Sequence, residues 1–360
     1  MSNPPVRPWS RRRKLRLLRT VFVAVALLVL VLVIRPGGGA TRAPSATSAP
    51  PGAAASSTAA PGATTTTAAL TVAALTVAAL PDPLPQPVSR AVVLVEGGRL
   101  LVLGGLHGSP PAVSTTQVLS VDPTSGAAVP EPSLAVATHD AAGAVVAGVA
   151  HVFGGGSGTT VDVVQTATAA GSRIVGHLPQ PRSDVESATT DRRAYVIGGF
   201  DGAKPTADVL VTTDGVTFHV AATLQVPVRY PAVAVLGSTI YVIGGQSITG
   251  PSGAGPPVTD VQAVNTTDGS ASVVAHLPAA LTEAAAFAVG GTLFVAGGVR
   301  GGVTQAGVYR LDPATGALTL VANLPTQRAD AGVAQIGDAT FLVGGEAPAR
   351  LSSIVELRPA

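Results

Sequence analysis

The chain has 360 residues, of which 42 are Gly, 30 are Pro and only 12% are charged, a composition typical of many short strands and turns. It contains no cysteine, which excludes disulfides, thiolate catalysis and cysteine-based metal sites. Nine basic residues occur up to Arg42 and the first acid is Asp82, so the rest of the chain carries 13 basic and 20 acidic residues, a net charge of −7. This mildly acidic remainder argues against a nucleic-acid-binding surface.

The N-terminal segment predicts a membrane anchor. A basic tail, residues 1–14, precedes the unbroken apolar run VFVAVALLVLVLVI at residues 21–34. The run alone spans about 21 Å as a helix, and extending it to residues 15–35 reaches the roughly 30 Å of a bilayer core. Because the cations precede the run, we expect a single-pass signal anchor with a cytoplasmic N-terminus and the rest of the chain outside. The alternative is a cleavable signal peptide, with small residues for cleavage at Gly37–Ala40, which would make the protein secreted.

The next segment, residues 36–67, is rich in Pro, Ala, Thr and Ser and has no apolar period. A segment that cannot bury an apolar face stays disordered. We therefore predict a disordered stalk, either a plain spacer or an O-glycosylated one.

From Arg90 onward the chain repeats one unit six times. Each unit has a short apolar segment, a tight turn and a second apolar segment that ends in a diglycine, as in AHVFGG and TIYVIGG. The first glycines of the pairs, separated by 50, 44, 46, 53 and 47 residues, are Gly104, Gly154, Gly198, Gly244, Gly297 and Gly344. Two further strand-like segments follow most diglycines, and a period in the forties indicates a propeller. We therefore predict an all-β fold over residues 68–360, a six-bladed β-propeller with four strands per blade.

These units resemble kelch repeats from about Arg90 to the C-terminus. The resemblance rests on the six diglycines, on Tyr195 and Tyr241 before two of them, and on the arginines that follow Leu-Pro in LPQPRSD and LPTQRAD. The fourth-strand Trp of the family is absent, and its third-strand Tyr occurs only as Tyr309. Kelch-like propellers include binding proteins and enzymes, so the resemblance implies a fold rather than one activity.

The sixth unit lacks a fourth strand, because the chain ends after SSIVELRPA. Upstream of the first unit, LTVAALP (Leu75–Pro81) aligns with LTLVANLP (Leu318–Pro325), the fourth strand of the fifth unit. Since an unpaired sheet edge is a liability, we predict that residues 70–80 close the ring by pairing with Ile354–Leu357. The letters LTVAA occur twice in succession there, and either copy satisfies the pattern.

Polar residues recur in the segments between units, where we expect them to meet the post-diglycine loops around one mouth of the propeller. Four units have an acid 14 residues before the first glycine of the pair, and two of these also have an arginine two positions before the acid. Arginines occur in the same segments of the other two units. The candidate ligand-binding residues are Arg90, Asp140, Arg182, Asp184, Arg229, Glu283, Arg328 and Asp330. The alternative is that these groups bond to turn amides and pair between neighbouring blades.

We expect a non-catalytic binding scaffold for a protein or glycan, held at the membrane by its N-terminal helix and without a nucleic-acid partner. The alternative is an enzyme of the sugar mutarotase type, which the kelch resemblance allows because it needs only polar side chains at the mouth. Galactose oxidase, another kelch-like propeller, depends on a Cys–Tyr cross-link that this chain cannot form. No metal-binding or phosphate-binding motif occurs, so we predict no cofactor, no metal and no catalytic residue.

Overall fold

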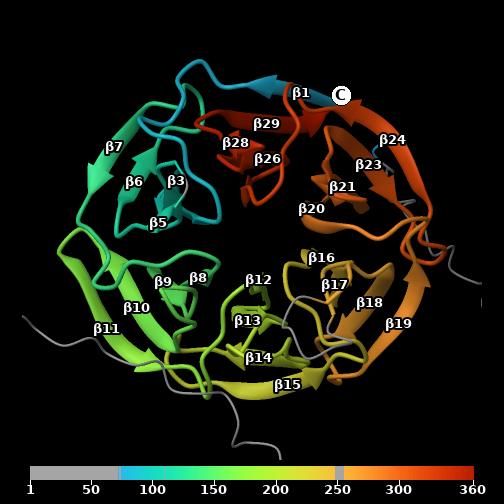
Figure 1. The fold of residues 1–360 in the computed structure, drawn as a ribbon, viewed down its shortest axis with the longest axis horizontal. Coiled ribbons are helices and arrows are strands. Elements are labelled where there is room, and N and C mark those ends of the chain that lie inside the picture. The colour runs from blue at the N-terminus through green and yellow to red at the C-terminus, as the bar shows by residue number, and fades with distance from the viewer. Residues whose placement is uncertain (1–71, 73, 110, 248–254) are drawn as a thin grey trace, which may run out of the picture. The chain divides into compact units, whose positions relative to one another are not determined.

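The computed structural model describes residue 72 and residues 74–109, 111–247 and 255–360. The described strands form six large antiparallel sheets around a central axis and two small two-stranded sheets. The predicted six-bladed all-β propeller is therefore confirmed (Figure 1). The predicted tail (1–14), signal anchor (15–35) and stalk (36–67) lie outside the described residues. Within the ranges just given, no helix is long and apolar enough to cross a membrane.

Each of the first five blades has four strands that follow chain order from the axis to the rim. The first blade contains β2 (Val92–Glu96), β3 (Arg99–Leu103), β6 (Val118–Val121) and β7 (Ala128–Glu131). The second contains β8 (Ala142–Val146), β9 (Val149–Phe153), β10 (Val163–Thr168) and β11 (Gly171–His177). The third contains β12 (Glu186–Thr190), β13 (Arg193–Ile197), β14 (Asp208–Thr212) and β15 (His219–Thr223).

The fourth blade contains β16 (Ala232–Leu236), β17 (Thr239–Ile243), β18 (Asp260–Asn265) and β19 (Ala271–His276). The fifth contains β20 (Thr282–Val289), β21 (Thr292–Arg300), β23 (Gly307–Leu311) and β24 (Leu318–Asn323). The sixth contains β25 (Gly332–Ile336), β26 (Ala339–Val343), β29 (Ile354–Pro359) and β1 (Leu75–Ala79). Five short strands lie in the loops after the diglycines: β4 (Leu106–His107), β5 (Val113–Ser114), β22 (Val303–Thr304), β27 (Glu346–Ala347) and β28 (Ala349–Arg350).

The hydrophobic core lies between the blades rather than at the axis. The buried apolar side chains form six clusters, and each cluster joins two neighbouring blades. The second strand of a blade is apolar on both faces because each face packs against a different neighbour. Strand β26, for example, is buried along its whole length, with Phe341 in one cluster and Leu342 in the next. The rigid ring that results holds the loops at its ends in place.

The diglycines set the distance between neighbouring blades. Gly154 and Gly155 both have a positive φ, 64° and 98°. A Cβ atom on Gly154 would lie 2.4 Å from the carbonyl oxygen of Arg182, at the start of the third blade, which is closer than side chains approach. The same oxygen accepts a hydrogen bond from the amide N of Gly155 at 2.8 Å. Glycine is therefore needed at this position for the two backbones to meet.

The other five seams repeat this hydrogen bond. Its donors are the amides of Gly105, Gly199, Gly245, Gly298 and Gly345, and its acceptors are the carbonyls of Thr138, Val228, Leu281, Arg328 and Val88. The diglycines thus mark the points where successive blades are joined.

The outer strand of the sixth blade comes from the N-terminal side of the propeller. Strand β1 is the second copy of LTVAA and pairs antiparallel with β29, from Leu75 opposite Pro359 to Ala79 opposite Val355 (Figure 1). Leu75 is 7% exposed and belongs to the apolar cluster between the fifth and sixth blades. The strand therefore covers the edge of β29 and joins the two ends of the ring.

Candidate functional site

Six equivalent residues, one per blade, surround one end of the central channel. Each lies 14 residues before the first glycine of its blade, just before the innermost strand or at its start. We call them the mouth ring: Arg90, Asp140, Asp184, Tyr230, Glu283 and Asp330. All six have a positive φ, between 51° and 59°, although none is glycine. Left-handed backbone costs about 1–2 kcal/mol at such residues, and strained positions of this kind cluster at functional sites.

The backbone of the mouth ring is held by hydrogen bonds between blades. Five of its six amides each donate to the carbonyl of the preceding ring member, at 2.9–3.2 Å. The residue just before each ring member pairs with the second residue after the first glycine of the same blade, as in Ser183 with Phe200 and Arg229 with Gln246. This pairing brings the post-diglycine loops next to the ring. The loops and the ring together surround the mouth, where the sequence predicted polar residues.

Arg90 extends across the opening. Its Nη2 lies 2.8 Å from Asp330 Oδ2 in the sixth blade, and its Nη1 lies 3.1 Å from Asp140 Oδ2 in the second. Nη1 also donates to the Tyr230 hydroxyl at 2.9 Å, although Tyr230 belongs to the opposite, fourth blade. The Arg90 side chain is 19% exposed, so solvent reaches this network. One guanidinium therefore links four blades at the mouth.

A second group of side chains surrounds Arg229. Its Nη1 lies 3.2 Å from Asp184 Oδ2, and its Nε and Nη2 donate to Gln246 Oε1. The guanidinium also lies 5.1 Å from the ring centres of both Phe200 and Tyr230, a distance at which cations and aromatic rings attract. Two aromatic faces are therefore present at the mouth.

On the sixth blade, Glu346 and Arg350 extend the polar network. Glu346 Oε1 accepts a hydrogen bond from Ser89 Oγ at 2.6 Å and lies 3.8 Å from Arg90 Nε. Arg350 Nε donates to the same Ser89 hydroxyl at 3.1 Å. Both residues follow the last diglycine, so they reach the mouth from a loop.

Burial shifts the acid–base behaviour of the ring. Burial raises the pKa of Asp140 and of Asp330, against the opposing effect of Arg90. Burial also raises the pKa of Asp184 to about 6, and the negative charge of Asp140 adds to that shift. Burial also raises the pKa of Glu283. Burial alone would lower the pKa of Arg90, but Asp140 and Asp330 raise it well above its usual value.

Two of the candidate arginines do not reach the mouth. Arg182 is fully buried, and its Nη1 donates to the carbonyls of Gly198 and Asp208 within the third blade. Arg328 bonds in the same way to the carbonyls of Gly344 and Ser353 in the sixth blade. The structural alternative expected bonds to turn amides and pairing between neighbouring blades. These two side chains instead hold backbone carbonyls within their own blades. We therefore remove both from the candidate ligand-binding set.

The other six candidates lie at the mouth. Arg90, Asp140, Asp184, Glu283 and Asp330 are ring members, and Arg229 is adjacent to the ring. Sequence reasoning missed Tyr230, although counting 14 residues back from Gly244 locates it. It also missed Gln246 and Glu346. Like Phe200, they lie two residues after the first glycine of their blades, a position that the diglycines locate.

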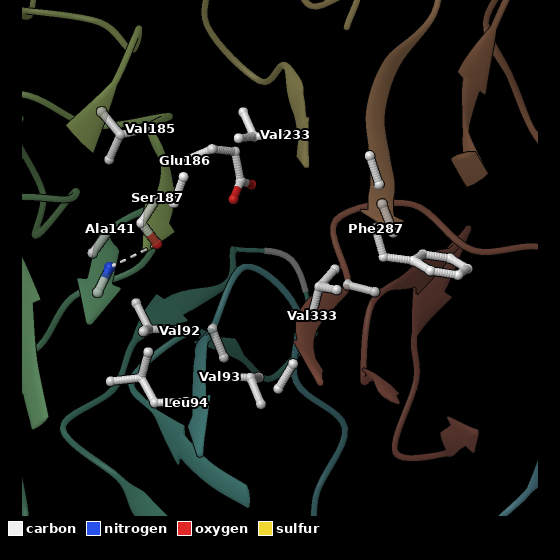
Figure 2. Close-up of a pocket in the computed structure, with 18 of the residues that line it drawn as sticks. Val92, Val93, Leu94, Ala141, Val185, Glu186, Ser187, Val233, Phe287 and Val333 are labelled. Carbon is white, nitrogen blue, oxygen red and sulfur yellow. Dashed lines mark hydrogen bonds between the residues drawn. The ribbon is translucent and has the colours of Figure 1, made fainter. Parts of the chain in front are cut away.

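Behind the ring lies a cavity of about 490 Å³ bounded by the six innermost strands. Val92, Val93, Val233 and Val333 are among the apolar residues on its wall (Figure 2). Glu186, which the sequence analysis did not single out, also faces it (Figure 2). Across the described part of the chain, no group of three or more His, Asp or Glu side chains is arranged to hold a metal ion.

Comparisons with known proteins establish the fold and no family. No protein-family model matches the chain, and no curated protein matches it. Among solved structures 562 chains match, which shows that the fold is common. One of them, described as the structure of YjhT, has a TM-score of 0.64 and 14% sequence identity, and the match covers 76% of this chain and 95% of that chain. Likeness at this identity establishes that this chain has the propeller fold and leaves its function to be argued from the site.

Proposed function

We propose that this protein is a membrane-tethered, extracytoplasmic, kelch-like propeller that binds a glycan, free or carried by a protein partner, at the mouth ring. One observation carries the proposal. Six equivalent positions, one from each blade, converge on a single opening, and every one of them holds a carboxylate, a guanidinium or a phenol.

The chemistry of the mouth suits hydroxyl groups. A sugar hydroxyl both donates and accepts hydrogen bonds, so it is recognised by carboxylates and guanidiniums placed side by side. Asp184 and Arg229 form such a pair, 3.2 Å apart. Phe200 and Tyr230, half-buried beside Arg229, add aromatic surface to the mouth.

A glycan array probed with the purified full-length chain tests this proposal. The best ligand is then titrated against wild type, Asp184→Asn and the control Glu131→Gln, which makes the same charge change on the outer strand β7. We expect Asp184→Asn to weaken binding roughly tenfold or more, because it removes a charged hydrogen-bond acceptor. We expect the control to bind like wild type. Absence of any glycan ligand, or equal binding by Asp184→Asn, would overturn the proposal.

An enzyme of the sugar mutarotase type is the second candidate, and one observation favours it. The pKa of Asp184, raised by burial to about 6, is close to neutral. A carboxylate with such a pKa is an efficient general base, and exchange of sugar anomers requires removal of a proton from the anomeric hydroxyl. Measuring anomer exchange by NMR with the array ligand separates the two functions. A binder leaves the spontaneous rate unchanged, whereas an enzyme accelerates it and loses that acceleration in Asp184→Asn.

The membrane tether is a proposal that rests on the sequence of residues 15–35. We expect the native chain to sediment with membranes and to be released into the soluble fraction when residues 15–35 are deleted. Mass spectrometry of the native N-terminus distinguishes an anchor from a cleaved signal, which would leave a chain that begins after residue 35. An uncleaved chain found in the soluble fraction would contradict both the signal anchor and the cleaved signal peptide.

A further inference from the structure

The innermost strand of the third blade differs from the other five. Each of the other five blades has a small or apolar residue two positions after its own mouth-ring member: Val92, Ala142, Ala232, Ala285 and Gly332. At this position β12 has Glu186. Because the six blades are repeats of one unit, the other five show that the fold does not require an acid there. Glu186 is therefore the exception that calls for an explanation by function.

The carboxylate of Glu186 is directed into the channel. Figure 2 shows it facing the cavity, whose apolar wall includes Val233 of the neighbouring fourth blade and Val333 of the opposite, sixth blade. Solvent reaches the side chain. Within the described residues, it forms no ion pair and no hydrogen bond with another side chain. The one charged group with a marked effect on it is Asp140, which is also an acid.

The surroundings define the kind of molecule that would fit. The cavity of about 490 Å³ is within the usual range for small-molecule sites. Its wall near Glu186 is largely aliphatic, so an apolar group is favoured there by burial. A lone carboxylate with another acid nearby and no basic partner favours a positive charge. When Glu186 is ionised, an anion would be repelled and a neutral molecule would leave the negative charge uncompensated.

We propose that the channel behind the mouth ring binds a small alkylammonium ion, with its ammonium group paired to Glu186 and its hydrocarbon chain against Val233 and Val333. This site lies in the same pocket as the mouth ring, but it rests on different residues from the glycan site. An alkylammonium fits because it combines one positive charge with an apolar body of the size that the channel accepts.

The protonation of Glu186 gives the site a signature. Partial desolvation by the surrounding channel wall, with a further contribution from Asp140, raises the pKa of Glu186 to about 8, although solvent still reaches the side chain. The other titratable groups that line the same cavity are those of the mouth ring: Arg90, Asp140, Asp184, Tyr230, Glu283 and Asp330. Of these, Asp140 is the one with a marked effect on Glu186. At pH 7 roughly one molecule in ten has the carboxylate, and at pH 9 about nine in ten do. An alkylammonium, like lysine, stays charged to about pH 10. Its affinity should therefore rise about tenfold between pH 7 and pH 9.

Isothermal titration of the full-length chain with n-butylammonium chloride and with 1-butanol tests the proposal. The two probes share a hydrocarbon chain and differ in charge. We expect butylammonium to bind wild type at least tenfold more tightly than butanol at pH 9. Glu186→Gln should abolish both the preference and the pH dependence, whereas Glu131→Gln should retain both. Glu186→Ala serves as a second variant that should fold, because three other blades have alanine at this position (Ala142, Ala232 and Ala285).

Three results would overturn the proposal. The first is failure of butylammonium to bind wild type at pH 9. The second is equal binding of butanol and butylammonium, which would mean that the channel recognises only the hydrocarbon. The third is butylammonium binding that survives in both Glu186 variants, which would locate the cation elsewhere, for example at the acids of the mouth ring.

Discussion

Strand β1 should contribute measurably to the stability of the whole propeller, and Leu75→Ala tests this. Leu75 is 7% exposed and packs in the apolar cluster between the fifth and sixth blades. The substitution removes three carbon atoms, worth about 2.4 kcal/mol at roughly 0.8 kcal/mol per methylene. Because an outer strand can shift inward to fill part of the space, we expect a total loss of about 2–3 kcal/mol, at the lower end for buried leucines.

Thermal and urea unfolding followed by circular dichroism measure the loss. For a domain of this size, we expect the midpoint temperature to fall by roughly 3–5 °C. The matched control is Thr76→Ala in the same strand, whose side chain is exposed and bonds weakly to the Arg358 carbonyl at 3.3 Å. Its effect should stay within about 0.5 kcal/mol. If Leu75→Ala unfolds like wild type, β1 is dispensable and the reasoning fails; if both variants lose equal stability, burial is not the cause.

Three further predictions concern the seams and the channel. Gly154→Ala should lower the free energy of unfolding, measured in urea, by about 2–4 kcal/mol, because its Cβ would meet the Arg182 carbonyl. The control Gly148→Ala, at a turn with open space, should lower it by about 1 kcal/mol. Equal losses would contradict the seam argument. Arg182→Met should cost about 2–4 kcal/mol yet leave glycan binding unchanged, since it only deprives two carbonyls of donors; weakened binding in the folded variant would return Arg182 to the site. Glu186→Ala should remove part of the pH dependence of stability: with its pKa raised to about 8 by burial, wild type loses stability as pH rises from about 4.5 to 8. Because the side chain is solvent-accessible, we expect the variant to gain only about 1–2 kcal/mol at pH 9 in urea titrations, and no gain would refute the shift.

Most of the fold could be predicted from the repeat pattern. Six diglycines at regular spacing specify six seams, because each glycine pair is required by the close approach of the next blade's carbonyl. The sixth unit lacks a fourth strand of its own, and LTVAALP upstream of the first unit resembles one. Together these two features predicted that the N-terminal side supplies the outer strand of the sixth blade. Which copy of LTVAA is paired could not be read from identical letters, and the structure has the second copy on β29.

The candidate site was only partly predictable, and the reason is backbone conformation. Arg182 and Asp184 are two residues apart, a spacing that would place both side chains on one face of an extended strand. Asp184 instead has a φ of 57°, which turns the chain between them, so Asp184 lies at the mouth and Arg182 is buried in the blade. The same turn at Tyr230 brings a phenol to the ring. Arginine and tyrosine rarely adopt a left-handed backbone, so the residue types at Arg90 and Tyr230 gave no sign of this conformation.

Glu186 was missed for a different reason. The sequence predicts a first strand in each unit, but only the position of β12 in the ring shows that its first side chain faces the channel. Aligning the six units on their diglycines exposes it as the one acid at its position.

The dissociation constant of the array-selected glycan for wild type and for Glu283→Gln tests the central claim most directly. Glu283 is the ring acid that forms no ion pair within the described residues, so its replacement by glutamine leaves no charged partner unpaired. If the mouth ring is the binding site, Glu283→Gln should bind roughly tenfold or more weakly while its unfolding midpoint does not fall below the wild-type value. Wild-type affinity in this variant, measured at the same pH and salt, would contradict the account.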